Sequence, residues 1–298
     1  MRILLIGAGG QLGRELIPRL SSLGELAAAD RTVCDLAATE AIRELVARTR
    51  PEAIVNAAAY TAVDEAESRS EVAYAINRDA PRTLAEEARK LGAMLVHYST
   101  DYVFDGSKPG AYCEEDATAP LNVYGASKLA GEREIALVGG RYMILRTSWV
   151  YGAQGKNFLL TMRRLARERE ELRVVDDQVG APTSTLQLAE ATARLVREWS
   201  TAGEGFPAGI YHATAAGSVS WCGFARAIVA ALGERDSLKV KNVVGITTEE
   251  YPMPARRPRN SVLSNEKFER TFGFRPGSWE TGLADVVREL YGCAVAES

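Results

Sequence analysis

The chain opens with a short apolar run that ends in a cluster of glycines, and this junction excludes most folds. Residues 2–6 read Arg-Ile-Leu-Leu-Ile and are followed by Gly-Ala-Gly-Gly-Gln-Leu-Gly at positions 7–13. An amphipathic pattern begins inside the glycine run, with Leu12, Leu16 and Leu20 on one face of a helix. A strand, a glycine turn and a helix in succession are typical of the first unit of a dinucleotide-binding α/β fold.

The rest of the first half repeats this alternation of strands and helices. We expect strands at 2–6, 25–29, 53–56, 94–98 and 142–146. We expect helices between them at 11–23, 39–49, 72–91 and 123–138. Successive units of this kind require right-handed crossovers and therefore predict a Rossmann-type, doubly wound parallel sheet in the α/β class.

After residue 152 the pattern loosens, which predicts a division into two parts. Residues 1–152 are expected to form an NAD(P)-binding Rossmann domain. Residues 153–298 are expected to form mainly a smaller substrate-binding lobe over the carboxyl edge of the sheet, with a return of the chain to the first domain left open. Helical patterns in this half lie at 158–169, 186–199, 221–232 and 281–291.

Composition excludes several classes of protein. The 298 residues are 46% hydrophobic and 25% charged, with a net charge of −3, so no general basic field attracts nucleic acid or anionic lipid. The first apolar run is too short for a signal peptide or a membrane span, which predicts a cytoplasmic protein without a membrane partner. The cysteines Cys34, Cys113, Cys222 and Cys293 are scattered and suggest neither disulfides nor a zinc site.

The glycine turn is the candidate site for a dinucleotide pyrophosphate. Gly7 would allow the tight turn, Gly10 would let the backbone approach the phosphates, and Gly13 would let the helix pack on the strand. The alternative is a purely structural turn. The G-x-x-G-x-x-G spacing favours the short-chain dehydrogenase/reductase group, with NADPH or NADH as the cofactor.

Residues after the second strand are candidates for the adenosine part of that cofactor. Asp30 favours the ribose hydroxyls of NAD, whereas Arg31 favours the 2′-phosphate of NADP, so the preference stays open. Asp35 and Leu36 are expected on the adenine side. Small residues at 56–61, after the third strand, would let backbone run beside the cofactor. The alternative for Asp30 and Arg31 is a solvated strand end, and the alternative for residues 56–61 is tight core packing.

A tyrosine and a lysine one helical turn apart form the candidate catalytic pair. Tyr124 and Lys128 share one helix face, and a neighbouring cation is what a phenol needs to work near neutral pH. Thr100 follows the fourth strand and falls at the carboxyl edge, where α/β proteins bind ligands. Tyr124 is expected to donate a proton to a substrate carbonyl that Thr100 holds, while Lys128 lowers the pKa of Tyr124 and binds the nicotinamide ribose.

Several motifs together resemble the dTDP-4-dehydrorhamnose reductase family, over nearly the whole chain. They are the loop at 7–13, Val-Asn-Ala-Ala-Ala-Tyr-Thr-Ala-Val-Asp at 55–64, Ser-Thr-Asp-Tyr-Val-Phe-Asp-Gly at 99–106, and Tyr124 with Lys128. Further matches are Arg-Thr-Ser-Trp-Val-Tyr-Gly at 146–152, Asp177-Gln178 with Gly180, Pro182 and Thr183, and Arg257-Pro258 with Asn260, Ser261 and Leu263.

The resemblance implies a reaction and its site residues. The reaction is reduction of the C4 keto group of dTDP-4-dehydro-L-rhamnose to dTDP-L-rhamnose, the last step of dTDP-rhamnose synthesis. Substrate contacts implied by the resemblance are Thr100, Asp101, Tyr124 and Trp149, the last with a core tryptophan as its alternative. Cofactor contacts implied are Gly10, Gln11, Leu12, Asp30, Asp35, Leu36, Ala59, Thr61, Tyr124 and Lys128.

Three further expectations concern charges, metal and assembly. The basic run 256–259 could neutralise a substrate diphosphate or be a solvated loop. The family resemblance implies a possible Mg²⁺ at a dimer contact, with Glu15 and Glu190 as candidates, although their spacing demands no metal. His97 and His212 are expected to be packed core residues, and the chain to be a monomer or homodimer.

Two other readings of the motifs stay open. The same fold serves as a non-catalytic regulatory subunit of methionine adenosyltransferase. A sister nucleotide-sugar 4-ketoreductase of other stereochemistry, or an epimerase that keeps its NAD bound, would also carry the glycine loop and the Tyr–Lys pair.

Overall fold

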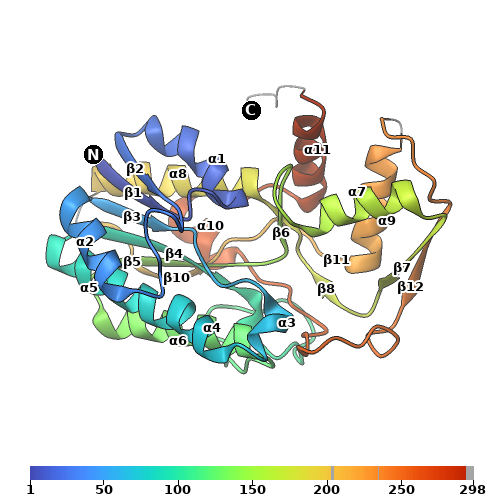
Figure 1. Cartoon of the computed structure of the whole chain (residues 1–298), viewed down its shortest axis with the longest axis horizontal. Coiled ribbons are helices and arrows are strands. Elements are labelled where there is room, and N and C mark those ends of the chain that lie inside the picture. Colours follow the sequence, from blue (N-terminus) through green and yellow to red (C-terminus); the bar gives the residue numbers. More distant parts are fainter. Residues whose placement is uncertain (203–204, 234, 293–298) are drawn as a thin grey trace.

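A parallel sheet of six strands forms the centre of the larger part of the protein (Figure 1). The computed structural model describes residues 1–202, 205–233 and 235–292. The strand order is β10-β5-β4-β3-β1-β2, and all the pairings are parallel. The bounds are β1 (Arg2–Ile6), β2 (Glu25–Ala29), β3 (Ala53–Asn56), β4 (Met94–Thr100), β5 (Arg141–Thr147) and β10 (Gly209–His212). The expected doubly wound α/β class is confirmed.

Helices cover both faces of this sheet (Figure 1). One face packs against α1 (Gln11–Ser21), α8 (Thr185–Ala202) and α10 (Glu266–Phe272). The other packs against α2 (Thr39–Thr49), α5 (Ala80–Leu91) and α6 (Val123–Val138). The central strands are accordingly apolar on both sides: every residue of β3 and β4 is buried.

A second, smaller lobe has its own apolar core. It contains α7 (Phe158–Glu168), α9 (Trp221–Leu232), α11 (Trp279–Leu290) and the parallel pair β7 (Glu171–Val175) and β12 (Asn242–Ile246). Two short strand pairs lie between the lobes in the chain path. They are β6 (Val150–Tyr151) with β9 (Thr183–Ser184), and β8 (Val179–Gly180) with β11 (Val219–Ser220).

The chain returns from the smaller lobe to the large sheet. The helix expected at 186–199 is α8, which packs beside α1, and β10 then pairs with β5 at the sheet edge. The helix α10 closes the same face through Phe268 and Phe272, and its short apolar pattern was not anticipated. The lobe that follows residue 152 is therefore built from separate segments.

One helix of the sheet domain differs from its expected form. The pattern at 72–91 predicts a continuous helix, but the structure has α4 (Ser70–Tyr74), a π-helical turn at Ala75–Asp79 and then α5. Asn77 lies in this turn, and its side chain bonds the backbone N–H of Tyr60 at 2.9 Å and the Ser127 hydroxyl at 3.0 Å. The widened turn lets a buried amide reach both partners, which an uninterrupted amphipathic pattern does not reveal.

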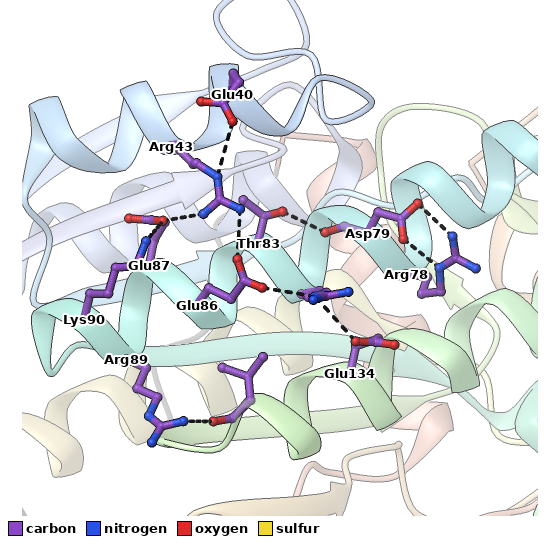
Figure 2. Close-up of polar contacts among 12 residues, drawn as sticks. Glu40, Arg43, Arg78, Asp79, Thr83, Glu86, Glu87, Arg89, Lys90 and Glu134 are labelled. Atoms are coloured by element: carbon purple, nitrogen blue, oxygen red, sulfur yellow. Dashed lines mark hydrogen bonds and ion pairs between the residues drawn. The ribbon is translucent and has the colours of Figure 1, made fainter.

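Ion pairs join the outer helices of this face (Figure 2). Arg43 of α2 reaches Glu86 and Glu87 of α5 at 2.9 and 2.6 Å. Arg82 of α5 lies 3.7 Å from Glu134 of α6. These charges are thus paired with one another at the surface, away from the sheet.

Two expectations about the chain as a whole can be compared with the described residues. Within 1–202, 205–233 and 235–292, no helix is both long and apolar enough to cross a bilayer. Cys34, Cys113 and Cys222 are free thiols, and Cys293 lies outside the described residues.

Candidate active site

The end of β4 supplies the first candidate catalytic group. Thr100 is buried at the carboxyl edge of the sheet, and the 3₁₀ turn η2 (Asp101–Val103) follows it directly. The Thr100 hydroxyl donates to a carboxylate oxygen of Asp101 at 2.9 Å and accepts the backbone N–H of Tyr102 at 3.2 Å. The hydroxyl is therefore held at the strand end by its own turn.

The first turn of α6 places Tyr124 against this hydroxyl. Asn122 caps the helix by accepting the N–H of Gly125 at 2.8 Å. A Cβ at Gly125 would lie 2.2 Å from the Tyr102 carbonyl oxygen, so only glycine lets the helix pack this closely on η2. The phenol of Tyr124 hydrogen-bonds with Thr100, and its ring meets that of Tyr102 edge to face at 6.0 Å.

Burial raises the pKa of both acidic groups at this site, the Tyr124 phenol and the Asp101 carboxyl. Burial and the nearby Asp101 carboxylate raise the pKa of Tyr124 to about 12, opposed by its hydrogen bond with Thr100. Burial also raises the pKa of Asp101 to about 7. Near neutral pH the site thus holds a phenol that carries its proton beside a carboxyl group that is about half protonated.

Lys128 lies one turn further along α6 and is almost fully buried. Its Nζ contacts the Tyr98 carbonyl oxygen at 2.5 Å and Nε2 of His97 at 3.1 Å. Burial lowers the pKa of Lys128 to about 8, while Glu132 opposes the shift. The structure therefore brings Thr100, Asp101 and Tyr124 together and holds the amine beside β4. The role of Lys128 in lowering the pKa of Tyr124 stays a prediction.

The glycine loop forms a tight turn, here called the glycine cradle, in which Gly7 and Gly13 leave no room for a side chain. Gly7 has φ +86°, and a Cβ there would lie 2.7 Å from the backbone nitrogen of Ala58. A Cβ at Gly13 would lie 2.1 Å from the Gly7 carbonyl oxygen. Gly10 is the exposed N-cap of α1, whose first turn carries no acidic residue. Backbone N–H groups at this helix end suit an anionic group.

Two buried hydroxyls lie further along the same carboxyl edge of the sheet, at the ends of β4 and β5. Ser99 Oγ and Thr147 Oγ1, at the ends of β4 and β5, have no hydrogen-bond partner among the described residues. Buried polar groups normally have one, so these strand ends are suited to a polar ligand. The cradle and the strand ends together fit an NAD(P) molecule.

The other expected cofactor residues surround the cradle in different ways. Asp30 lies next to Gly9 and accepts the N–H and the hydroxyl of Thr32 at 2.9 and 2.6 Å, while Arg31 is exposed. Gln11 is held by Asn157 at 3.3 Å. Asp35, Ala59 and Thr61 are exposed or partly exposed, whereas Leu12 and Leu36 are buried. Asp35 accepts the N–H of Ala37 at 2.9 Å.

A cavity of about 800 Å³ is lined by residues 105–107, which follow η2, and by residues of the smaller lobe. Thr100, Asp101, Tyr124 and Trp149 are not among the residues that line it. Its lining includes Leu121 just before α6, Phe158 and Trp221 of the smaller lobe, and the basic run. Arg257 pairs with Asp64 at 2.7 Å and Arg259 with Glu249 at 3.1 Å. Arg256 has no ion-pair partner in the described part of the chain and is exposed at the cavity.

Trp149 stands in a strained conformation against a second tryptophan. Its φ of +48° is unusual for a bulky residue. Its ring stacks on Trp221 with centroids 3.5 Å apart, and a Cβ at Gly180 would lie 2.5 Å from its indole. Trp149 is partly exposed and does not line the cavity, whereas Trp221, on which it stacks, does.

The expected metal site gains no support. No group of three or more His, Cys, Asp or Glu side chains able to hold a metal occurs among the described residues. Glu15 and Glu190 both contact Arg19 instead, at 3.0 and 3.4 Å. The arginine supplies the positive charge at this place.

Sequence reasoning missed three residues that shape the site. Trp221 comes from a helix about seventy positions beyond Trp149. The only sequence signal for it is a large aromatic residue at the start of an amphipathic pattern. Asn77 sits inside a helix pattern as an interruption. His97 contacts Lys128, although it was expected to be only a packed core residue.

Comparisons with known proteins agree with this geometry. Residues 1–291 match a family described as the RmlD substrate binding domain. The chain is 48% identical to the dTDP-4-dehydrorhamnose reductase of Burkholderia thailandensis, over 97% of this chain and 99% of that protein.

Solved structures show the same likeness. A dTDP-4-dehydrorhamnose reductase from Clostridium acetobutylicum has a TM-score of 0.90 and 39% identity, covering 98% of this chain and all of that one. The enzyme from Bacillus anthracis, solved in complex with NADP, has a TM-score of 0.89 and 37% identity, covering 97% and 99% of the two chains. The chain therefore belongs to the RmlD family, in which dTDP-4-dehydrorhamnose reductases are found.

Proposed function

We propose that the protein reduces the C4 keto group of dTDP-4-dehydro-L-rhamnose to dTDP-L-rhamnose with NADPH, the last step of dTDP-rhamnose synthesis. The observation that carries the proposal is the Thr100–Tyr124 pair at the carboxyl edge of the sheet. The glycine cradle lies at the same edge of the sheet, and residues 105–107, which follow the η2 turn, line the cavity bordered by arginines. Relatives named for this reaction cover the whole length of the chain.

The residues of the chain supply the proton and the orientation for this reduction. NADPH supplies the hydride when bound. Tyr124 donates its phenolic proton to the oxygen that was the ketone, and Thr100 holds that oxygen by a hydrogen bond. Lys128 stands on the same helix face, and in its protonated form we expect it to serve Tyr124 as the source of positive charge.

Each lobe would hold one partner of the reaction. The domain of residues 1–152 binds the cofactor through the loop Gly7–Gly13 and through the residues near Asp30. The complex of a relative with NADP supports NADPH, and Arg31 is the residue placed to meet a 2′-phosphate. The smaller lobe binds the sugar nucleotide, with Arg256 and Arg257 beside the diphosphate.

The proposed reaction can be tested with the purified protein. NADPH oxidation is followed with the keto sugar nucleotide, and the product is identified by NMR. We expect stoichiometric oxidation and a product with the L-rhamno configuration. A different sugar would refute the substrate, cofactor that copurifies and is not consumed would favour an epimerase, and no turnover where a known reductase works would favour a regulatory subunit.

The stacked tryptophans predict an effect on substrate binding. Trp221→Ala is expected to raise KM for the sugar nucleotide by roughly tenfold, because it removes a flat wall of the cavity and the support of Trp149. Trp221→Phe keeps an aromatic wall and should recover most of the loss. Steady-state kinetics with Trp199→Phe provides the control, because Trp199 is a buried tryptophan of α8 in the core of the sheet domain. Unchanged KM in the alanine variant would contradict the placement of the substrate.

The raised pKa of Asp101 predicts a loss of activity with alkaline pH. When Asp101 is ionised, its carboxylate accepts the hydrogen bond of the Thr100 hydroxyl, at 2.9 Å. When Asp101 is protonated, the Thr100 hydroxyl is free to donate its hydrogen bond to the substrate oxygen. The active form is thus the protonated one, present below the pKa of about 7 and lost as the pH rises through it. Asp101→Asn cannot ionise, so its profile of kcat against pH should lack this step. A step that persists in the asparagine variant would refute the assignment.

A further inference from the structure

A buried chain of hydrogen bonds runs from β3 to the lysine of α6. Nδ2 of Asn56 lies 3.0 Å from Nδ1 of His97, and Nε2 of His97 lies 3.1 Å from Nζ of Lys128. The three residues are 1%, 1% and 2% exposed, so water does not complete their hydrogen bonds. The chemistry assigned above uses Lys128 and gives His97 no task.

The sheet register creates this chain. Asn56 and His97 are direct partners in the parallel pairing of β3 with β4, and their side chains therefore point to the same face. The helix α6 packs on that face and places Nζ of Lys128 in contact with the imidazole of His97. The Tyr98 carbonyl oxygen is the second group that Nζ contacts, at 2.5 Å.

The donors and acceptors of the chain determine the charge of the lysine. The amide of Asn56 is oriented by the Ala58 N–H, which donates to its Oδ1 at 3.2 Å, so Nδ2 donates to Nδ1 of His97. A neutral imidazole that accepts at Nδ1 carries its proton on Nε2. That proton points at Nζ of Lys128, which can accept it only as a neutral amine. The observed arrangement is thus the one that suits uncharged Lys128.

We propose that His97 is a positioning residue whose tautomer is coupled to the charge of Lys128. When Lys128 is neutral, Nε2–H of His97 holds the amine against β4. When Lys128 gains a proton, it has only donors, and the match with Nε2–H is lost. The imidazole must then carry its proton on Nδ1, with a turned Asn56 amide, or release the ammonium toward Tyr124 on the same face of α6.

The other ionisable groups around Lys128 and His97 do not replace this coupling. Glu132, on the same helix, stabilises the ammonium but is itself bound by Arg146 of β5 at 2.7 Å. Apart from Lys128, only burial shifts the pKa of His97, which lies well below its usual value, so the ring itself stays neutral. The remaining charged or titratable groups on elements packed against α6 are Asp64, Glu65, Glu71, Tyr74, Arg78, Asp79, Arg82, Glu86, Glu87, Arg89, Lys90, Tyr98, Asp101, Tyr102, Arg141 and Tyr142.

The coupling gives the proposed reduction a lysine that can exchange its proton near neutral pH. Burial lowers the pKa of Lys128 to about 8, and the donor and acceptor forms of His97 give the amine a buried partner in either state. This consequence rests on the proposed function. The coupling itself is a property of the chain without cofactor or substrate.

Nitrogen NMR of the imidazoles tests the coupling directly. The chain has two histidines, so ¹⁵N-histidine labelling of the full chain gives two rings, and His212→Gln assigns them. We expect the His97 nitrogens to show the Nε2–H tautomer at high pH and to change together at the pKa of Lys128, about 8, without the ring becoming charged. The change should vanish in Lys128→Met, while His212 should show no such step.

Kinetics provide a second measurement that separates positioning from a purely structural role. In His97→Leu the buried ammonium loses an acceptor, which costs the charged form more than the neutral one. In the Asp101→Asn background, which lacks the Asp101 step, the alkaline limb of kcat/KM is expected to report loss of the Lys128 proton near pH 8. The His97→Leu change should therefore move this limb to lower pH by roughly one unit. His97→Gln, whose amide can donate or accept, should restore the limb, and His212→Leu is the control for loss of a buried histidine.

Two outcomes would overturn the proposal. One is a His97 ring whose nitrogen signals stay constant through the titration of Lys128 or show Nδ1–H at high pH. The other is a His97→Leu enzyme with the pH profile of the unmodified chain. Because the NMR measurement needs neither substrate nor turnover, its failure is distinct from a failure of the proposed reaction.

Discussion

Replacing Tyr124 by phenylalanine is expected to lower kcat by a factor of roughly 10² to 10⁴, the usual contribution of a positioned proton donor. The change removes the hydroxyl that contacts Thr100 and keeps the ring that packs against Tyr102. The fold of α6 should be unaffected, since the Asn122 cap and the close contact at Gly125 do not involve the phenol oxygen. Single-turnover oxidation of NADPH measures the loss.

The binding of NADPH should be almost unchanged in this variant. The glycine cradle lies at the start of α1 and makes no use of the phenol. Tyr102→Phe is the matched control, because it removes a neighbouring phenol, bound to Arg257, that has no part in the proton transfer. Near-normal turnover in Tyr124→Phe, or an equal loss in both variants, would remove Tyr124 from its proposed role.

Glu132→Ala is expected to lower the free energy of unfolding by roughly 3–5 kcal/mol, the largest stability change we anticipate for one residue. The Glu132 and Arg146 side chains are 1% and 3% exposed and meet through two bonds of 3.0 and 2.7 Å. Removing the carboxylate leaves a guanidinium buried between α6 and β5 without its counter-charge. Chemical denaturation of the purified variant measures the change.

A second glutamate of α6, which pairs with an arginine of α5, provides the control. Glu134 lies 3.7 Å from Arg82 at the surface, and Glu134→Ala should change the free energy of unfolding by about 1 kcal/mol or less. Replacing Glu132 and Arg146 together by apolar residues of similar size should recover much of the stability, because no lone charge stays buried. Equal effects of Glu132→Ala and Glu134→Ala would contradict this account.

Much of the fold followed from local patterns. The strands β1, β2 and β3 begin and end where the apolar runs predicted, because each run is bounded by glycine, proline or polar residues. The π-helical turn at Asn77 was not predictable in the same way. It depends on the contacts of one amide with Tyr60 and Ser127, which belong to other segments of the chain.

The same distinction between local patterns and contacts with distant segments applies to the candidate site. Thr100 and Tyr124 belong to short motifs whose neighbours in sequence also hold them in space, such as Asn122 and Gly125. The contact of His97 with Lys128 depends on the register of β3 with β4, and that of Trp149 with Trp221 on the path of the smaller lobe. Neither of these two contacts can be derived from the spacing of residues in the sequence. The same reasoning explains why Lys128 was expected beside Tyr124 but is held at β4.

The return of the chain through α8, β10 and α10 has a consequence for protein engineering. The two lobes cannot be exchanged between relatives as an amino-terminal half and a carboxyl-terminal half. A fragment that stops near residue 152 would leave β5 without β10 and α1 without α8. A chimera that transplants only the sugar-binding side needs several junctions, placed where the chain leaves and re-enters the sheet. A library of such enzymes would be best built by exchanging the segments around α7, α9 and α11 while one parent keeps the whole sheet.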